Sequence, residues 1–153
     1  LSNTNRWVLS EFIVHEALQL WDDKRIEWDN VDLRYNELKI EVKTSAYIQS
    51  WSQNKLSRIV FDIAPRKKAW DSVLNTTGNS KWREADVYVF CLLNLRDKES
   101  AIESEILDMK NWSFYIVKTD TLNSIFPEQK SISLIKLETI SKSVSFSEVK
   151  NFF

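Results

Sequence analysis

The segment from Asp86 to Leu93 constrains the fold more than any other part of the chain. Its sequence, DVYVFCLL, is apolar almost throughout. A strand that is apolar on both faces is typical of the centre of a sheet that is covered on each side. We therefore expect an α/β fold in which this segment is the central buried strand.

The remaining pattern predicts helices and strands in alternation on both sides of this strand. Expected helices span 5–21, 98–111 and 119–126, with a terminal helix opened by a capping box at Ser145 and Glu148. Expected strands span 25–28, 31–35, 38–44, 58–63, 114–117 and 132–137. Residues 67–78 are ambiguous. This order predicts a mixed central sheet flanked by helices.

Composition fits one domain over residues 1–153, with a core of about 5–118 and a strand and helix extension from 119 to 153. The single glycine excludes a glycine-rich phosphate loop. The single histidine and single cysteine exclude zinc fingers, internal disulfides and multi-histidine metal sites. A catalytic metal would therefore need oxygen ligands, which favour magnesium, manganese or calcium. No run is apolar enough to span a bilayer, and the lone cysteine in an apolar run fits a cytoplasmic protein.

Residues 31–35 and 38–44 form the clearest pattern of alternating apolar and polar side chains. A tight turn at residues 36–37 makes the apolar faces of the two strands coincide, with Val31 opposite Val42. The pattern therefore predicts an antiparallel hairpin with a two-residue turn.

The same register places Asp32 directly opposite Glu41, where Cβ atoms lie about 4.5–5.5 Å apart. Lys43 projects from the same face as Glu41. Two opposed carboxylates repel each other, and a divalent cation would relieve the repulsion. The alternative is an ordinary solvated strand face, on which Glu41 pairs with Lys39 or Lys43.

Asp32, followed after eight residues by Glu41-Val42-Lys43, resembles the acidic and lysine motif of the PD-(D/E)XK nuclease superfamily. That superfamily includes restriction endonucleases, Holliday-junction resolvases and phage exonucleases. The resemblance covers about residues 5–93 and implies a restriction-endonuclease-like core. The proline that often precedes the family aspartate is absent, and Val31 stands in its place.

The resemblance also implies a role for each residue of the motif. Asp32 and Glu41 would bind Mg²⁺ or Mn²⁺, with help from the backbone carbonyl of Val42. Lys43 would position the attacking water or stabilise charge that develops on phosphorus. The expected catalytic residues are therefore Asp32, Glu41 and Lys43.

Many members of that superfamily also carry a glutamate on the first helix, and this role maps onto Glu11 as a catalytic residue and metal ligand. Glu16 is a rival, because helical projection places it inside an apolar arc where a carboxylate needs a partner. For either residue, an ordinary surface or capping glutamate is the alternative.

Basic residues gather between Gln53 and Arg83, where seven basic and two acidic side chains give a local excess of five positive charges. Tryptophans are interspersed with them. Basic and aromatic side chains together suit a phosphate backbone and unstacked bases. The candidate nucleic-acid contacts are Gln53, Arg58, Arg66, Lys67 and Lys68.

From these observations we expect a metal-dependent nuclease that hydrolyses phosphodiester bonds in DNA. One alternative is a catalytically inactive nuclease-like module that binds DNA or a protein partner. A second is a metal-dependent phosphoesterase that acts on RNA or a nucleotide. A homodimer is compatible with the resemblance, because many proteins of that fold need two active sites to cut two strands.

Overall fold

The computed structural model of the chain describes residues 2–21, 31–67 and 81–153. The strand expected at 25–28, the ambiguous segment from 68 to 78 and the candidate Lys68 lie outside the described residues. The side chain of Lys67 is also outside the description.

The central element is a four-stranded mixed sheet with the strand order β1-β2-β6-β7. Its strands are β1 (Leu33–Tyr35), β2 (Leu38–Ala46), β6 (Val87–Leu93) and β7 (Trp112–Lys118). Strands β2 and β6 are parallel, whereas the two outer pairs are antiparallel. All seven residues of β6 are buried. The α/β class, the mixed sheet and the central strand are therefore confirmed.

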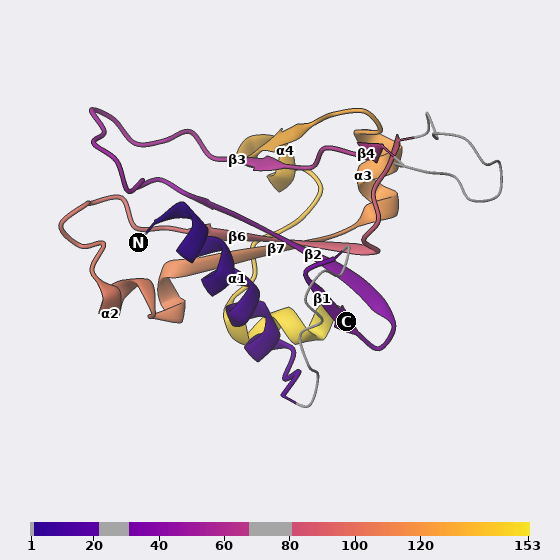
Figure 1. Cartoon of the computed structure of the whole chain (residues 1–153), viewed down its shortest axis with the longest axis horizontal. Coiled ribbons are helices and arrows are strands. Elements are labelled where there is room, and N and C mark those ends of the chain that lie inside the picture. Colours follow the sequence, from indigo (N-terminus) through magenta and orange to yellow (C-terminus); the bar gives the residue numbers. More distant parts are fainter. Residues whose placement is uncertain (1, 22–30, 68–80) are drawn as a thin grey trace.

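Helix α1 (Asn3–Ala17) precedes the sheet, and shorter elements connect or follow its strands. These are β3 (Val60–Asp62), β4 (Arg66–Lys67), β5 (Lys81–Trp82), α2 (Glu103–Ile106), η1 (Met109–Asn111), α3 (Thr119–Ile125), β8 (Ser131–Ser133), α4 (Leu134–Glu138) and η2 (Phe146–Phe152). Strand β3 pairs with β8, and β4 pairs with β5. Figure 1 shows α1 on one side of the central sheet, with β3 and α4 on the other.

Each face of the central sheet packs into its own hydrophobic cluster. Ile40 and Val42 of β2 pack with buried residues of α1, among them Ile13 and Val14. The opposite cluster contains Tyr88, Phe90 and Leu92 of β6 with Phe61 and Ile63. Because side chains alternate along a strand, Glu41 and Lys43 face away from α1, toward the second cluster.

The hairpin between β1 and β2 has the predicted turn and register. Leu33 pairs with Ile40, and Tyr35 pairs with Leu38. Asn36 and Glu37 have φ angles of 45° and 69°. A two-residue turn with two positive φ angles matches the right-handed twist of the strands that it joins.

The predicted pairing of Val31 with Val42 is wrong, because the hydrogen-bonded ladder between the two strands ends at Leu33. The chain bends at residues 31–32, so the alternation of β1 does not extend to Val31. Val31 is 6% exposed and packs in the cluster on the opposite face from Val42. The apolar pattern at Val31 therefore reports burial, but on the other face.

Helix α1 is shorter than the expected span of 5–21. The hydroxyl of Ser2 accepts a hydrogen bond from the N–H of Asn5 and caps its start. Gln19 adopts a φ of 58°, which ends the helical path. Leu18 and Leu20 still pack in the core, so the apolar periodicity outlasts the helix. None of the helices in the described residues is long and apolar enough to cross a membrane.

The single helix expected at 98–111 is wrong, since only the short α2 and η1 form there. The indole N–H of Trp112 donates to the carbonyl of Ile106, and the side-chain amide of Asn111 donates to that of Glu105. These side chains take the carbonyls that a continuing helix would use. Ile102 and Leu107 are more than half exposed, so a longer helix would gain little apolar burial.

The C-terminal predictions hold in part. The span 132–137 was expected to be extended, but Ser133 caps α4 by accepting the N–H of Lys136, so the strand ends there. The capping box of Ser145 and Glu148 is present, but the helix it opens is a 3₁₀ helix.

Arg83 connects several segments that pack on the face of the central sheet opposite to α1. It is 6% exposed, and its guanidinium donates to the carbonyls of Ile63, Phe126 and Gln129 and to the side-chain oxygen of Asn123. These acceptors lie after β3, in α3 and in the segment that leads to β8. Arg83 therefore holds β3 in position over the central sheet.

We predict that Arg83→Met lowers the free energy of unfolding by about 3 kcal/mol or more, because it leaves several buried acceptors without a donor. Urea denaturation of the wild-type and variant proteins measures the change. Lys142→Met is the matched control, since Lys142 is exposed. Equal losses in both variants would contradict the structural role of Arg83.

Candidate active site

Glu41 and Lys43 form an ion pair on β2, at the face that the alternation assigns them. The Nζ atom of Lys43 lies 2.7 Å from the Oε1 atom of Glu41. Arg66 reaches the same oxygen from β4, with its guanidinium nitrogen 3.5 Å away. Glu41 is only 7% exposed. The fold therefore places a nearly buried carboxylate, Glu41, between two cationic side chains.

The position of β2 in the sheet explains why Glu41 is buried. β6 runs beside it, and Glu41 is paired with Tyr88 across the parallel ladder. Burial first, and then the nearby Glu41 carboxylate, raise the pKa of Tyr88 to about 12. Tyr88 is therefore a neutral phenol next to Glu41 at ordinary pH.

Asp32 lies just before β1 and binds the backbone of β2. Its N–H donates to the carbonyl of Ile40 over 3.1 Å, and its Oδ2 atom accepts the N–H of Val42 over 2.7 Å. Strand β2 extends past the end of β1, so the carboxylate takes the place of a ladder partner for Val42. The predicted direct pairing of Asp32 with Glu41 is replaced by this contact.

The two carboxylates nevertheless interact. The pKa of Asp32 is raised, first by burial and then by the negative charge of Glu41. The hydrogen bond from Val42 and the charges of Lys43 and Arg66 oppose this shift without cancelling it. The folded protein therefore holds a carboxylate that would be more stable if it were protonated or bound to a cation.

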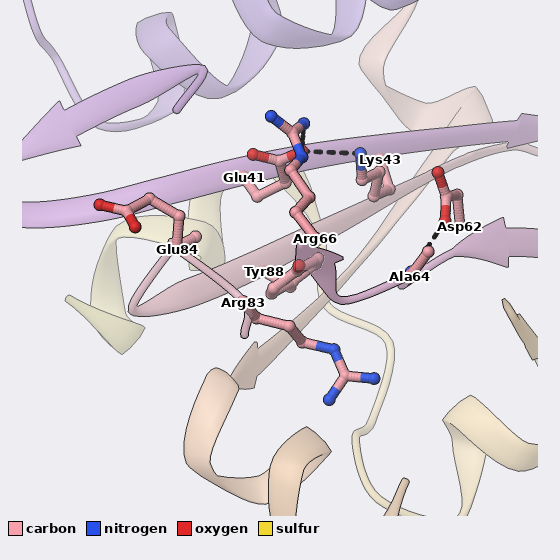
Figure 2. A pocket seen from close by; sticks show the side chains of 9 residues that line it. Glu41, Lys43, Asp62, Ala64, Arg66, Arg83, Glu84 and Tyr88 are labelled. Carbon is pink, nitrogen blue, oxygen red and sulfur yellow. Dashed lines mark hydrogen bonds and ion pairs between the residues drawn. The ribbon is translucent and has the colours of Figure 1, made fainter. Parts of the chain in front are cut away.

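A pocket lies over Glu41 and Lys43, as Figure 2 shows. Its lining comprises Glu41, Lys43, Asp62, Ala64, Arg66, Arg83, Glu84, Ala85 and Tyr88. In Figure 2 the guanidinium of Arg66 meets Glu41, whereas that of Arg83 points away from it. Sequence reasoning missed Asp62, Glu84 and Tyr88, because no spacing in the chain links their strands to β2.

Two of the acidic residues that line the pocket already accept hydrogen bonds from other groups of the protein. Asp62 accepts the N–H of Ala64 over 2.8 Å. Glu84 accepts Lys39 Nζ and the indole N–H of Trp82, both over 2.6 Å. These contacts lower the pKa of Glu84, so it remains a carboxylate.

The residues around Asp32 fit a hard divalent cation. The carboxylates of Asp32 and Glu41 supply oxygen ligands, and the carbonyl of Val42 points to the same strand edge as that of Ile40, which accepts the N–H of Asp32. Within the described residues no group of three or more acidic, histidine or cysteine side chains could hold a metal ion. A divalent cation here would have two carboxylates and one carbonyl as protein ligands and would have to keep several waters.

Glu11 and Glu16 both lie on α1. That helix contacts the face of β2 that carries Ile40 and Val42, opposite to Glu41. Glu16 accepts the indole N–H of Trp21 over 3.3 Å and lies 3.4 Å from His15 Nδ1. A metal-binding role for either glutamate stays a prediction.

The candidate nucleic-acid contacts lie in different parts of the structure. Arg66 lies at the pocket, with a side chain that is 64% exposed. Arg58 is exposed outside the pocket lining. Gln53 organises its own loop, since its side chain accepts the N–H of Gln49 and donates to the carbonyl of Tyr47 and the hydroxyl of Ser57.

The fold and the site thus define an α/β protein that carries a compact acidic and basic cluster on one face of a mixed sheet. The model of the Bacteriophage T4 endonuclease IV family matches residues 1–135. This match covers most of the 153 residues, so the chain belongs to that family and is a member of a nuclease family. No curated protein and no solved structure gives a significant match.

We predict that Asp32→Asn raises the thermal midpoint of the metal-free protein at pH 7, by a few degrees at most. The raised pKa of Asp32 means that its ionised form destabilises the fold, and asparagine still accepts the N–H of Val42. Below the ordinary aspartate pKa of 3.8 the carboxyl is neutral in both states, so the gain should disappear. Melting curves at several pH values test this.

Asp97→Asn is the control for this prediction. Asp97 is exposed and also accepts a backbone N–H, from Glu99 over 3.1 Å. An equal rise in both variants, or a lower midpoint for Asp32→Asn at pH 7, would show that Asp32 is not strained by burial and Glu41.

Proposed function

We propose that this chain is a metal-dependent nuclease that hydrolyses phosphodiester bonds in DNA at the site of Asp32, Glu41 and Lys43. The observation that carries the proposal is that the Glu41 carboxylate is nearly buried, 7% exposed, in contact with Lys43 and beside Asp32. It occurs in a chain that belongs to a nuclease family. The resemblance of residues 32–43 to the PD-(D/E)XK motif supports the same assignment of roles.

Asp32 and Glu41 bind Mg²⁺ or Mn²⁺ in this proposal, with the Val42 carbonyl as a third protein ligand. Such an ion, when bound, polarises a phosphoryl oxygen and lowers the pKa of a coordinated water. The N–H of Val42 holds the Asp32 carboxylate at the strand edge and so fixes one ligand in advance. Tyr88 and the apolar cluster that it belongs to pack on the protein side of Glu41 and limit the access of bulk water from that side.

Lys43 has two tasks in sequence. Without metal it neutralises Glu41 and so makes the burial of that carboxylate tolerable. With a cation at Glu41, the ammonium of Lys43 would be free to orient the attacking water or to bind a phosphoryl oxygen. Its side chain is 22% exposed, so its head group can reach a substrate in the pocket.

We predict that Glu41→Gln and Lys43→Met each reduce DNA cleavage about 100-fold or more, since each removes an interaction with charge that develops in the transition state. The assay is nicking or linearisation of circular DNA with Mg²⁺ or Mn²⁺. Circular DNA has no ends, so its loss also shows endonucleolytic cleavage. Glu99→Gln, an exposed glutamate outside the pocket, should leave the rate unchanged.

Variants with wild-type rates and intact folds would place the chemistry elsewhere. Circular dichroism and melting curves establish that the variants fold. A folded wild-type protein that binds DNA but fails to cut it with either metal would contradict the nuclease proposal and favour a binding module.

We also predict that Mn²⁺ raises the thermal midpoint of the wild-type protein. A ligand that binds only the folded state stabilises it by about 2.7 kcal/mol at a concentration 100 times its Kd. The rise should be absent in Glu41→Gln and present in Glu99→Gln. An equal rise in all three proteins would assign the cation to another site.

A further inference from the structure

Arg66 differs from Lys43 in how firmly it is held at Glu41. Lys43 makes a 2.7 Å contact and is 22% exposed, whereas Arg66 makes a 3.5 Å contact and is 64% exposed. The contact is long and its Arg66 side is exposed, so it contributes less free energy than the Lys43 contact and is more easily screened by salt. The guanidinium of Arg66 is therefore positioned at the site but can leave Glu41 at small cost.

The charge of Arg66 acts on the whole site and not on Glu41 alone. It is among the charges that oppose the upward pKa shifts of Asp32 and Tyr88. Figure 2 shows its side chain extending across the pocket to Glu41 on β2. A ligand that enters this pocket to meet Glu41 and Lys43 would therefore also meet Arg66.

A guanidinium is a strong ligand for phosphate, because its N–H groups form two parallel hydrogen bonds with two phosphoryl oxygens. A carboxylate that binds a divalent cation no longer needs a cationic side chain for neutralisation. The cation would also repel a guanidinium only a few ångströms away. Occupation of Glu41 by a cation and release of Arg66 toward a phosphate are thus linked by charge.

We propose that Arg66 is a catalytic residue that exchanges Glu41 for the scissile phosphate when Glu41 binds the metal ion. This inference rests on the proposed function and extends it, since it names the group that binds the phosphoryl oxygens. It also makes Arg66 and the metal ion competitors for Glu41 in the absence of DNA. That competition gives the proposal a consequence that is independent of catalysis.

The experiment compares the wild-type protein with Arg66→Ala in three measurements. The Mn²⁺ affinity without DNA should become tighter in the variant, by up to about fivefold, because an exposed competing ion pair is removed. Single-turnover cleavage at saturating Mn²⁺ should fall about 100-fold, because a ligand of the phosphoryl oxygens is lost.

The third measurement is DNA affinity with Ca²⁺ and with EDTA. Ca²⁺ takes the same oxygen ligands. Arg66→Ala should weaken DNA binding with Ca²⁺ and change it less with EDTA, since Glu41 retains the guanidinium when no cation is present. Lys110→Ala is the matched control, because Lys110 is 71% exposed and lies 3.0 Å from Asp108, outside the pocket lining.

Tighter Mn²⁺ binding together with slower cleavage supports the proposal, because a merely structural arginine would not move the two in opposite directions. Unchanged or weaker Mn²⁺ binding, or wild-type cleavage in Arg66→Ala, overturns it. If the wild-type protein cuts DNA and Arg66→Ala has the same Mn²⁺ affinity and cleavage rate, only this inference is wrong. A wild-type protein that binds neither cation nor cuts DNA removes the proposed function as well.

Discussion

The site is organised around the burial of one carboxylate, Glu41, in the middle of a mixed sheet. Removing a charge from water is costly, and an ion pair offsets that cost only in part. Lys43 and Arg66 supply the compensating charge, while Tyr88 fills the neighbouring position on β6. An apolar residue at position 41 would stabilise the sheet more simply. A nearly buried charge in contact with charged partners makes this position a candidate functional site.

The pleat of β2 separates support from chemistry. Ile40 and Val42 pack against α1 on one face, and Glu41 and Lys43 meet the pocket on the other. The same alternation orders the backbone, since Val42 can offer its N–H to Asp32 while its side chain stays in the core. Residues 40–43 therefore carry Glu41 and Lys43 on one face and hold Asp32 through the N–H of Val42.

The sequence predicts those features that follow from local periodicity. The register of the hairpin and the shared face of Glu41 and Lys43 come from patterns of period two, whereas the buried β6 comes from an almost uninterrupted apolar run. The contact of Asp32 with Val42 was not predictable, because it depends on where the β1 ladder ends. The approach of Arg66 depends on tertiary packing of β4 over the sheet, which spacing along the chain does not encode. The missing helix at 98–111 reflects side-chain amide and indole donors that take its carbonyls.

The two acidic residues of the site differ in how favourably each would bind a cation. Burial and Glu41 leave Asp32 with a raised pKa, so a divalent cation relieves a repulsion that the metal-free fold carries. Glu41 already has two cationic partners, so a metal ion must displace at least part of that neutralisation. At the proposed metal site, the binding free energy would be a balance between relief at Asp32 and competition at Glu41. Because Arg66 is the more weakly held competitor, it is the first group that metal binding would release, and it would be released beside the place where a phosphate has to bind.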